Sequence, residues 1–134
     1  MHRLISAGIA VLALQVAAAE PVCPWPEAGS QQQRYHQQLS CYDQELVKAR
    51  RSLEQWEKHH EFALQQHRQR TGRPAALNSY LSARESFKQL KEQHCRWQYQ
   101  LQLPDVQAGA ALYKHCQLQL INQRKVDLES LAAQ

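Results

Sequence analysis

Apolar and polar side chains follow one another with a helical period over most of the chain after residue 30. Between residues 31 and 70, apolar or aromatic positions recur at alternating spacings of four and three residues. The residues of this stripe are Tyr35, Leu39, Tyr42, Leu46, Ala49, Leu53, Trp56, His60, Ala63 and His67. A mean spacing of about 3.5 residues is typical of helices that pack along their length. The pattern therefore predicts one long helix over residues 31–70.

Two further helices are predicted after it. Gly72 and Pro74 end the first helix, and Pro104 followed by Asp105, a suitable N-cap, opens the third. The predicted second helix spans residues 75–101, and its stripe is Leu77, Tyr80, Ala83, Phe87, Leu90, His94, Trp97 and Leu101. The predicted third helix spans residues 106–132, with apolar positions at Leu112, Cys116, Leu120, Ile121, Leu128 and Leu131. No segment alternates as a strand does, so the predicted fold class is all-α, an antiparallel bundle of three long helices.

The first helix is too long for this bundle. At 1.5 Å per residue it would measure about 60 Å, against about 40 Å for the other two. Ser30 and Gln33 fit the capping box that starts a helix. We therefore expect residues 31–44, at its N-terminal end, to extend beyond the other helices.

The first nineteen residues resemble a cleaved secretory signal. Arg3 is followed by an apolar run from Leu4 to Val16, and the segment ends in three alanines at residues 17–19. The run is short for a membrane span, which needs about 20 residues, although a retained N-terminal anchor is the alternative. The sequence thus predicts a signal peptide over residues 1–19, a Pro-rich segment over residues 20–30, and a periplasmic or secreted helical domain over residues 31–134 without a stable membrane anchor.

Charge and motifs narrow the function classes. Cleavage after Ala19 would remove Arg3 and leave 15 basic against 12 acidic residues, a net charge of +3. So small an excess gives no indication of nucleic-acid binding. The chain has no G-x-S-x-G, H-E-x-x-H or glycine-rich phosphate-binding motif. We therefore expect a protein that is not an enzyme and needs no cofactor.

The four cysteines have two interpretations. Cys95 and Cys116 each follow a histidine, so His94 and His115 could complete a zinc site; however, adjacent residues on a helix point about 100° apart, which disfavours a shared ion. An even number of cysteines in a small exported chain favours disulfides. Cys95 and Cys116 come level in an antiparallel hairpin that turns at Pro104. We therefore assign Cys95–Cys116 and Cys23–Cys41, although four cysteines allow three pairings.

A family pattern runs through residues 41 to 131. The stretches CYDQELVKARRSLEQ, ARESFKQLKEQHCRWQ and LYKHCQLQLINQRKVDLESL resemble the LprI-like family of small exported bacterial proteins. The positions that carry the resemblance are Asp43, Leu46, Phe87, Cys95, Cys116, Leu120, Arg124 and Leu128. The family's namesake is lipid-anchored, whereas no lipid-modification sequence precedes Cys23. The resemblance implies a helical fold with a Cys95–Cys116 bridge, and it implies binding of a protein partner such as a lysozyme, which the namesake inhibits.

The sequence allows more than one contact surface and more than one function. Arg68, Arg70 and Arg73 could contact an acidic surface or a carboxylate-lined cleft, and the loop over residues 102–107, with Asp105, is a second candidate. Solvated arginines on an exposed face are the plainer interpretation. The alternative functions are a structural or stress role in the cell envelope without an enzyme target, and weak periplasmic metal binding by histidines such as His60 and His67. The sequence does not determine the oligomeric state.

Overall fold

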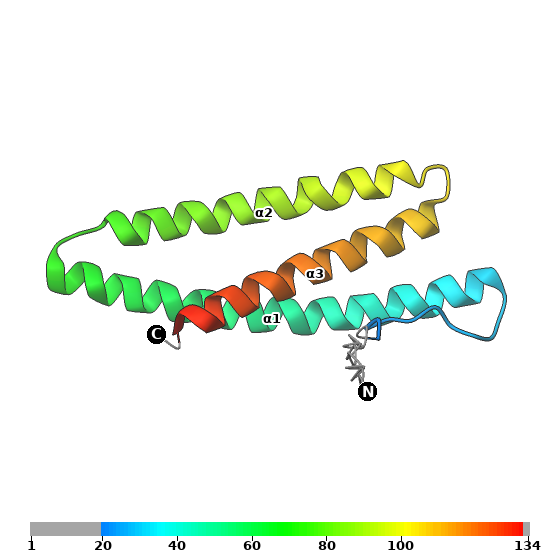
Figure 1. Cartoon of the computed structure of the whole chain (residues 1–134), viewed down its shortest axis with the longest axis horizontal. Helices are drawn as coiled ribbons and strands as arrows, with labels where there is room; N and C mark the ends of the chain where they lie inside the picture. The colour runs from blue at the N-terminus through cyan, green and yellow to red at the C-terminus, as the bar shows by residue number, and fades with distance from the viewer. Residues whose placement is uncertain (1–19, 133–134) are drawn as a thin grey trace, which may run out of the picture.

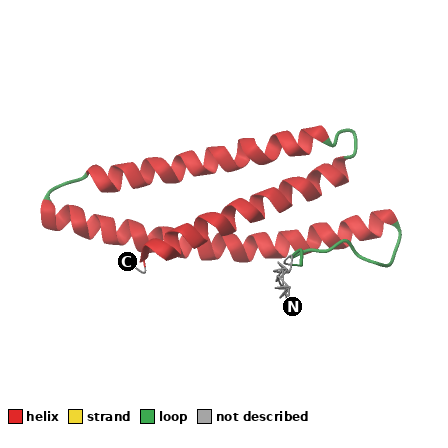
Figure 2. Cartoon of the chain, in the orientation of Figure 1, coloured by secondary structure: helices red, strands yellow, loops and turns green. Residues whose placement is uncertain are grey.

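The computed structural model describes residues 20–132, which form three helices and no strand (Figures 1 and 2). Helix α1 spans Gln31–Thr71, α2 spans Ala75–Leu101 and α3 spans Val106–Ala132. The predicted bounds are therefore correct for α2 and α3 and one residue short for α1. In this part of the chain, no helix is long and apolar enough to cross a membrane. The predicted signal peptide lies outside the described residues.

Local capping explains where the helices begin and end. The Ser30 backbone N–H donates to Oε1 of Gln33 at 2.8 Å, and the Gln33 backbone N–H donates to Oγ of Ser30 at 3.2 Å, which completes the predicted capping box. At the other end of α1, Gly72 adopts a φ of 66° and donates to the Arg68 carbonyl, a conformation that glycine adopts without a side-chain clash. Asp105 caps α3 by accepting a hydrogen bond from the backbone N–H of Ala108 at 3.0 Å.

Helix α3 lies against both of the other helices, which contact each other much less. Consecutive helices are antiparallel, so α1 and α3 run in the same direction (Figure 1). Near the turn that joins them, α1 and α2 meet directly: Tyr80 donates to the Glu57 carbonyl at 2.8 Å, and Arg84 pairs with Glu61 at 2.6 Å. This α1–α2 turn extends well past the end of α3 (Figure 1).

The N-terminal end of α1 extends past the α2–α3 turn, as expected, but by less than residues 31–44 (Figure 1). Tyr42 is already buried against α3, where its hydroxyl lies 3.3 Å from Nδ1 of His115, and Asp43 pairs with Lys114. The Pro-rich segment folds back along this end of α1. The Trp25 ring packs edge-on against Tyr35, and Nε2 of Gln38 donates to the Cys23 carbonyl at 3.1 Å.

The apolar core lies between α1 and α3. Its α1 side is the predicted stripe of Tyr42, Leu46, Ala49 and Leu53, and its α3 side is Leu118, Ile121 and Leu128. Burial of a Leu or Ile side chain stabilises a fold by about 1.5–3 kcal/mol, so these residues dominate the packing of the two parallel helices.

The predicted packing of the apolar stripe in the second half of α2 is wrong, although the helix itself is correctly predicted. Leu90, Trp97 and Leu101 are 57%, 49% and 71% exposed, and His94 between them is exposed too, whereas Cys95 is fully buried. On a helix, Cys95 and Trp97 point about 200° apart. The disulfide at Cys95 therefore turns the predicted stripe away from α3. A heptad spacing reveals that a helix has an apolar stripe, but it does not reveal whether a neighbour covers that stripe. Leu112 and Leu131 of α3, which the pattern also predicted as packed, are 38% and 56% exposed.

Candidate macromolecule-binding surfaces

Two disulfides tie the elements together. Cys23 is bonded to Cys41 and Cys95 to Cys116, with Cα atoms 5.9 Å and 5.6 Å apart, and no cysteine is free. The first disulfide holds the Pro-rich segment to α1, and the second joins α2 to α3 behind their turn. Two disulfides with no free thiol are typical of a protein from an oxidising compartment.

His94 and His115, which lie beside the second disulfide, do not point toward a common metal site. His94 packs against the Trp97 ring with centroids 5.9 Å apart, whereas His115 lies against Tyr42. Within residues 20–132, no three His, Cys, Asp or Glu side chains come together in a way that could hold a metal ion. His60 instead places its Nε2 2.6 Å from the Leu128 carbonyl, where it helps to join α1 to α3.

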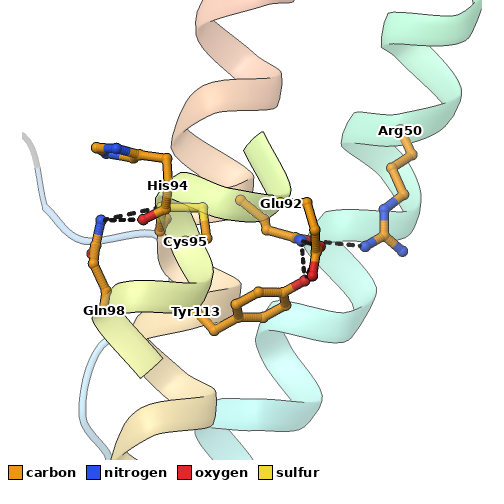
Figure 3. Close-up of a disulfide and its surroundings, with 8 residues drawn as sticks. Arg50, Glu92, His94, Cys95, Gln98 and Tyr113 are labelled. Carbon is orange, nitrogen blue, oxygen red and sulfur yellow. Dashed lines mark hydrogen bonds between the residues drawn. A yellow bond between two sulfur atoms is a disulfide. The ribbon is translucent and has the colours of Figure 1, made fainter. Parts of the chain in front are cut away.

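A polar network next to the Cys95–Cys116 disulfide joins all three helices (Figure 3). Tyr113 on α3 donates to Glu92 on α2 at 2.5 Å, and Nε2 of Gln117 donates to the Tyr113 hydroxyl at 2.6 Å. Arg50 on α1 donates to Oε1 of Gln117 at 3.1 Å. Figure 3 shows this network on one side of the disulfide and His94 with Gln98 on the other. The network fixes the register of the helices, because Gln117 is 95% buried and its amide would otherwise lack partners.

The network shifts two ionisation equilibria. Burial, together with the hydrogen bond to Glu92, raises the pKa of Tyr113 to about 12. The hydrogen bond from Tyr113, together with the ion pair to Arg96, holds the pKa of Glu92 below its usual range. Glu92 therefore remains a carboxylate and Tyr113 a phenol at neutral pH, which keeps the donor and the acceptor matched.

Sequence reasoning missed this network. Glu92, Tyr113 and Gln117 fall outside the apolar stripes, so a pattern of hydrophobic positions does not detect them. The one available signal was the i,i+4 spacing of Tyr113 and Gln117, next to Cys116 on the helix that the disulfide ties to α2.

The residues of the family pattern occupy two regions of the bundle. Leu46 and Leu128 are core residues, and Leu120 is half-buried. The guanidinium carbon of Arg124 on α3 lies 5.7 Å from the centre of the Phe87 ring on α2, a cation–π contact. Asp43 pairs with Lys114 near the N-terminal end of α1. Apart from Leu120, each of these residues packs in the core or makes a contact between helices.

Arg68, Arg70 and Arg73 lie at the projecting α1–α2 turn. In the described part of the chain, no carboxylate lies within salt-bridge distance of any of them, and all three are exposed. They do not form one patch. Arg68 lines a hollow of about 550 Å³ with Pro74 and Leu77, whereas Arg70 lines another, of about 460 Å³, with Tyr80 among others.

Asp105 lies at the opposite end of α2, about 40 Å from the arginines along the helix axis. The loop over residues 102–107 contains a cis peptide bond before Pro104, and it exposes Leu103 and Val106. Next to it, a hollow of about 510 Å³ lies between α2 and α3. Its lining residues are Arg96, Tyr99, Gln100, Leu103, Ala110, Tyr113 and Lys114. The two candidate contact surfaces from the sequence are therefore separate, one at each end of α2.

No protein-family model, curated protein or solved structure matches this chain.

Proposed function

We propose that this chain is an exported helical protein that binds another macromolecule through its α1–α2 turn. The observation that carries the proposal is the placement of Arg68, Arg70 and Arg73 on a turn that projects past the end of α3 (Figure 1). Three guanidinium groups without a carboxylate partner in the described residues can each donate hydrogen bonds to an acidic partner. Arg68 and Arg70 also lie in the last turn of α1, where a positive charge interacts favourably with the helix C-terminus.

The first partner class to test is the lysozymes. The resemblance of residues 41–131 to the LprI-like family implies such a target. A glycosidase cleft carries two catalytic carboxylates, and an exposed arginine on the projecting turn can pair with one of them. Many lysozymes are basic, so a partner with a net charge of +3 would gain no long-range attraction. Inhibition would therefore depend on short-range contacts made by the turn.

The test is an inhibition assay on the oxidised chain over residues 20–134 against a panel of lysozymes. We expect inhibition of at least one lysozyme at about micromolar concentration. The variant R68Q/R70Q/R73Q should lose at least about tenfold in affinity, which corresponds to about 1.4 kcal/mol. The matched control is K48Q/R51Q/K58Q, which removes three exposed cations from the middle of α1.

The two variants distinguish the outcomes. Equal losses in both would mean that overall charge, rather than the turn, drives binding. No inhibition of any lysozyme by the wild-type chain would contradict a lysozyme target and leave a structural or stress role in the envelope as the function to test next.

A further inference from the structure

Helix α2 presents a second apolar stripe to solvent. This outer stripe consists of Ala83, Leu90, His94, Trp97 and Leu101, all of them exposed. The side of α2 that faces the other helices carries apolar residues such as Leu77 and Phe87 together with half-buried charged residues such as Lys91. Helices on a protein surface normally turn their polar side to water. Packing within the monomer therefore leaves the outer stripe uncovered.

The spacing of the outer stripe identifies the kind of partner that it fits. Together with half-buried Phe87, its residues stand at positions 83, 87, 90, 94, 97 and 101. The spacing therefore alternates between four and three residues. Such a stripe fits a second helix that packs along it as in a coiled coil. From Ala83 to Leu101 the stripe is about 27 Å long.

The charges around the outer stripe fit a second copy of the same chain. One border consists of Ser86, Gln93 and Gln100, which are uncharged and recur every seven residues. The exposed charged residues of α2, Glu85, Lys88 and Arg96, lie about 140–220° around the helix from Ala83, on the side opposite the outer stripe. Two copies would therefore meet without like-charge repulsion, which normally prevents a surface from binding itself.

We propose that this protein forms a two-fold symmetric dimer in which the outer stripes of α2 from two copies pack antiparallel. The stripe has its smallest residue, Ala83, at one end and its largest, Trp97 and Leu101, at the other. An antiparallel pair places Leu101 of one copy against Ala83 of the other, Leu90 against His94 and Trp97 against half-buried Phe87, so that no residue of the stripe meets its own copy. A parallel pair would set Trp97 against Trp97 and Ala83 against Ala83, with uneven spacing between the helices.

The dimer is reversible. One face of a single helix is smaller than the standard interface of about 800 Å² per partner, so we expect a dissociation constant of roughly micromolar order. This surface is distinct from the α1–α2 turn, and the dimer does not depend on the proposed binding function. Because the contact is apolar, added salt should leave the dimer intact, whereas binding through the arginines of the turn should weaken.

Sedimentation velocity on the oxidised chain over residues 20–134 tests the dimer. Between about 1 µM and about 500 µM the mean mass should rise from that of one chain toward that of two. The variant L90S/W97S/L101S should bind itself at least about tenfold more weakly. The matched control is V47S/F62S/V126S, whose three residues are 55%, 62% and 53% exposed and lie on α1 and α3. Circular dichroism checks that each variant stays helical, and L101S alone replaces the triple variant if that one unfolds.

Spin labels test the orientation. In the antiparallel dimer, a label at Ser86→Cys of one chain should lie closer to a label at Gln100→Cys of the other than either label lies to its own copy. A wild-type chain that stays monomeric at every concentration would overturn the proposal, and so would equal losses in the stripe and control variants. Closer contact between identical labels would overturn the antiparallel arrangement.

Discussion

Gly109 in α3 lies directly against Tyr99 in α2. A β-carbon built on Gly109 would lie 2.8 Å from Cδ2 of the Tyr99 ring and 3.0 Å from the Tyr99 carbonyl oxygen. The absence of a side chain at Gly109 thus allows the two helices to approach closely beside their turn. This approach lies two turns of α3 before Cys116, so the glycine and the disulfide together set the geometry of the hairpin.

The first prediction concerns this contact. Gly109→Ala should lower the free energy of unfolding by about 1–3 kcal/mol, because the new methyl group overlaps both the ring and the backbone. Tyr99→Ala in the same chain should recover part of the loss, since it removes the ring but leaves the carbonyl in place. Chemical denaturation of the two single variants and the double variant measures both effects. Strictly additive losses would show that the ring and the glycine are not in contact.

The two disulfides should have separate effects. Their cysteines are 18 and 21 residues apart, so the chain-entropy model gives each disulfide about 3 kcal/mol of stability. Cys95→Ala/Cys116→Ala should destabilise the α2–α3 hairpin and with it the polar network. Cys23→Ala/Cys41→Ala should release residues 20–30 from α1 and leave the three helices paired.

Hydrogen exchange distinguishes these two results. We expect faster exchange throughout α2 and α3 in the first variant, and faster exchange confined to the start of α1 in the second. Uniform loss of protection in both variants would contradict separate roles for the disulfides.

The third prediction concerns the pH dependence of stability. The folded protein lowers the pKa of Glu92 from 4.5, so Glu92 contributes stability above pH 4.5 that is lost as the pH falls through its folded pKa. Glu92→Gln should therefore be less stable than the wild type at pH 7, and the difference should shrink in acid. Denaturation at several pH values measures it. A difference that does not change between pH 7 and acid would rule out this role for the Glu92 carboxylate.

The contact between Phe87 and Arg124 gives a fourth prediction. A cation over an aromatic ring stabilises by about 0.5–2 kcal/mol, depending on its exposure to water. A double-mutant cycle with Phe87→Leu and Arg124→Met should show a favourable coupling within this range. The matched cycle pairs Phe62→Leu, on the exposed surface of α1, with Arg124→Met, and it should show no coupling.

The sequence predicted the helices well because their boundaries are local. Ser30 with Gln33, Gly72 and Asp105 determine helix ends through contacts within a few residues, so these ends can be derived from the chain alone. The core residues of α1 could also be predicted from the sequence, because the apolar stripe of this helix is the face that the structure buries. The Cys95–Cys116 pair followed from the similar distances of the two cysteines from the turn at Pro104 and Asp105, and it left Cys23 to pair with Cys41.

The orientation of α2 could not be derived in the same way. Its apolar stripe and its cysteine compete for the inward position, and spacing alone does not rank a disulfide against four apolar side chains. The network of Arg50, Glu92, Tyr113 and Gln117 was also beyond reach, because it joins three helices whose relative rotation the sequence does not state. The separation of the two contact surfaces, by contrast, follows from the sequence, because the predicted helix over residues 75–101 lies between them.

The most direct test of an exported, disulfide-linked chain is intact mass spectrometry of the protein recovered from the periplasm or the culture medium. We expect a chain that begins at Glu20 and takes up no alkylating reagent until a reductant is added. Four thiols that react without reductant, or a chain that keeps residues 1–19, would contradict an exported protein clamped by Cys23–Cys41 and Cys95–Cys116.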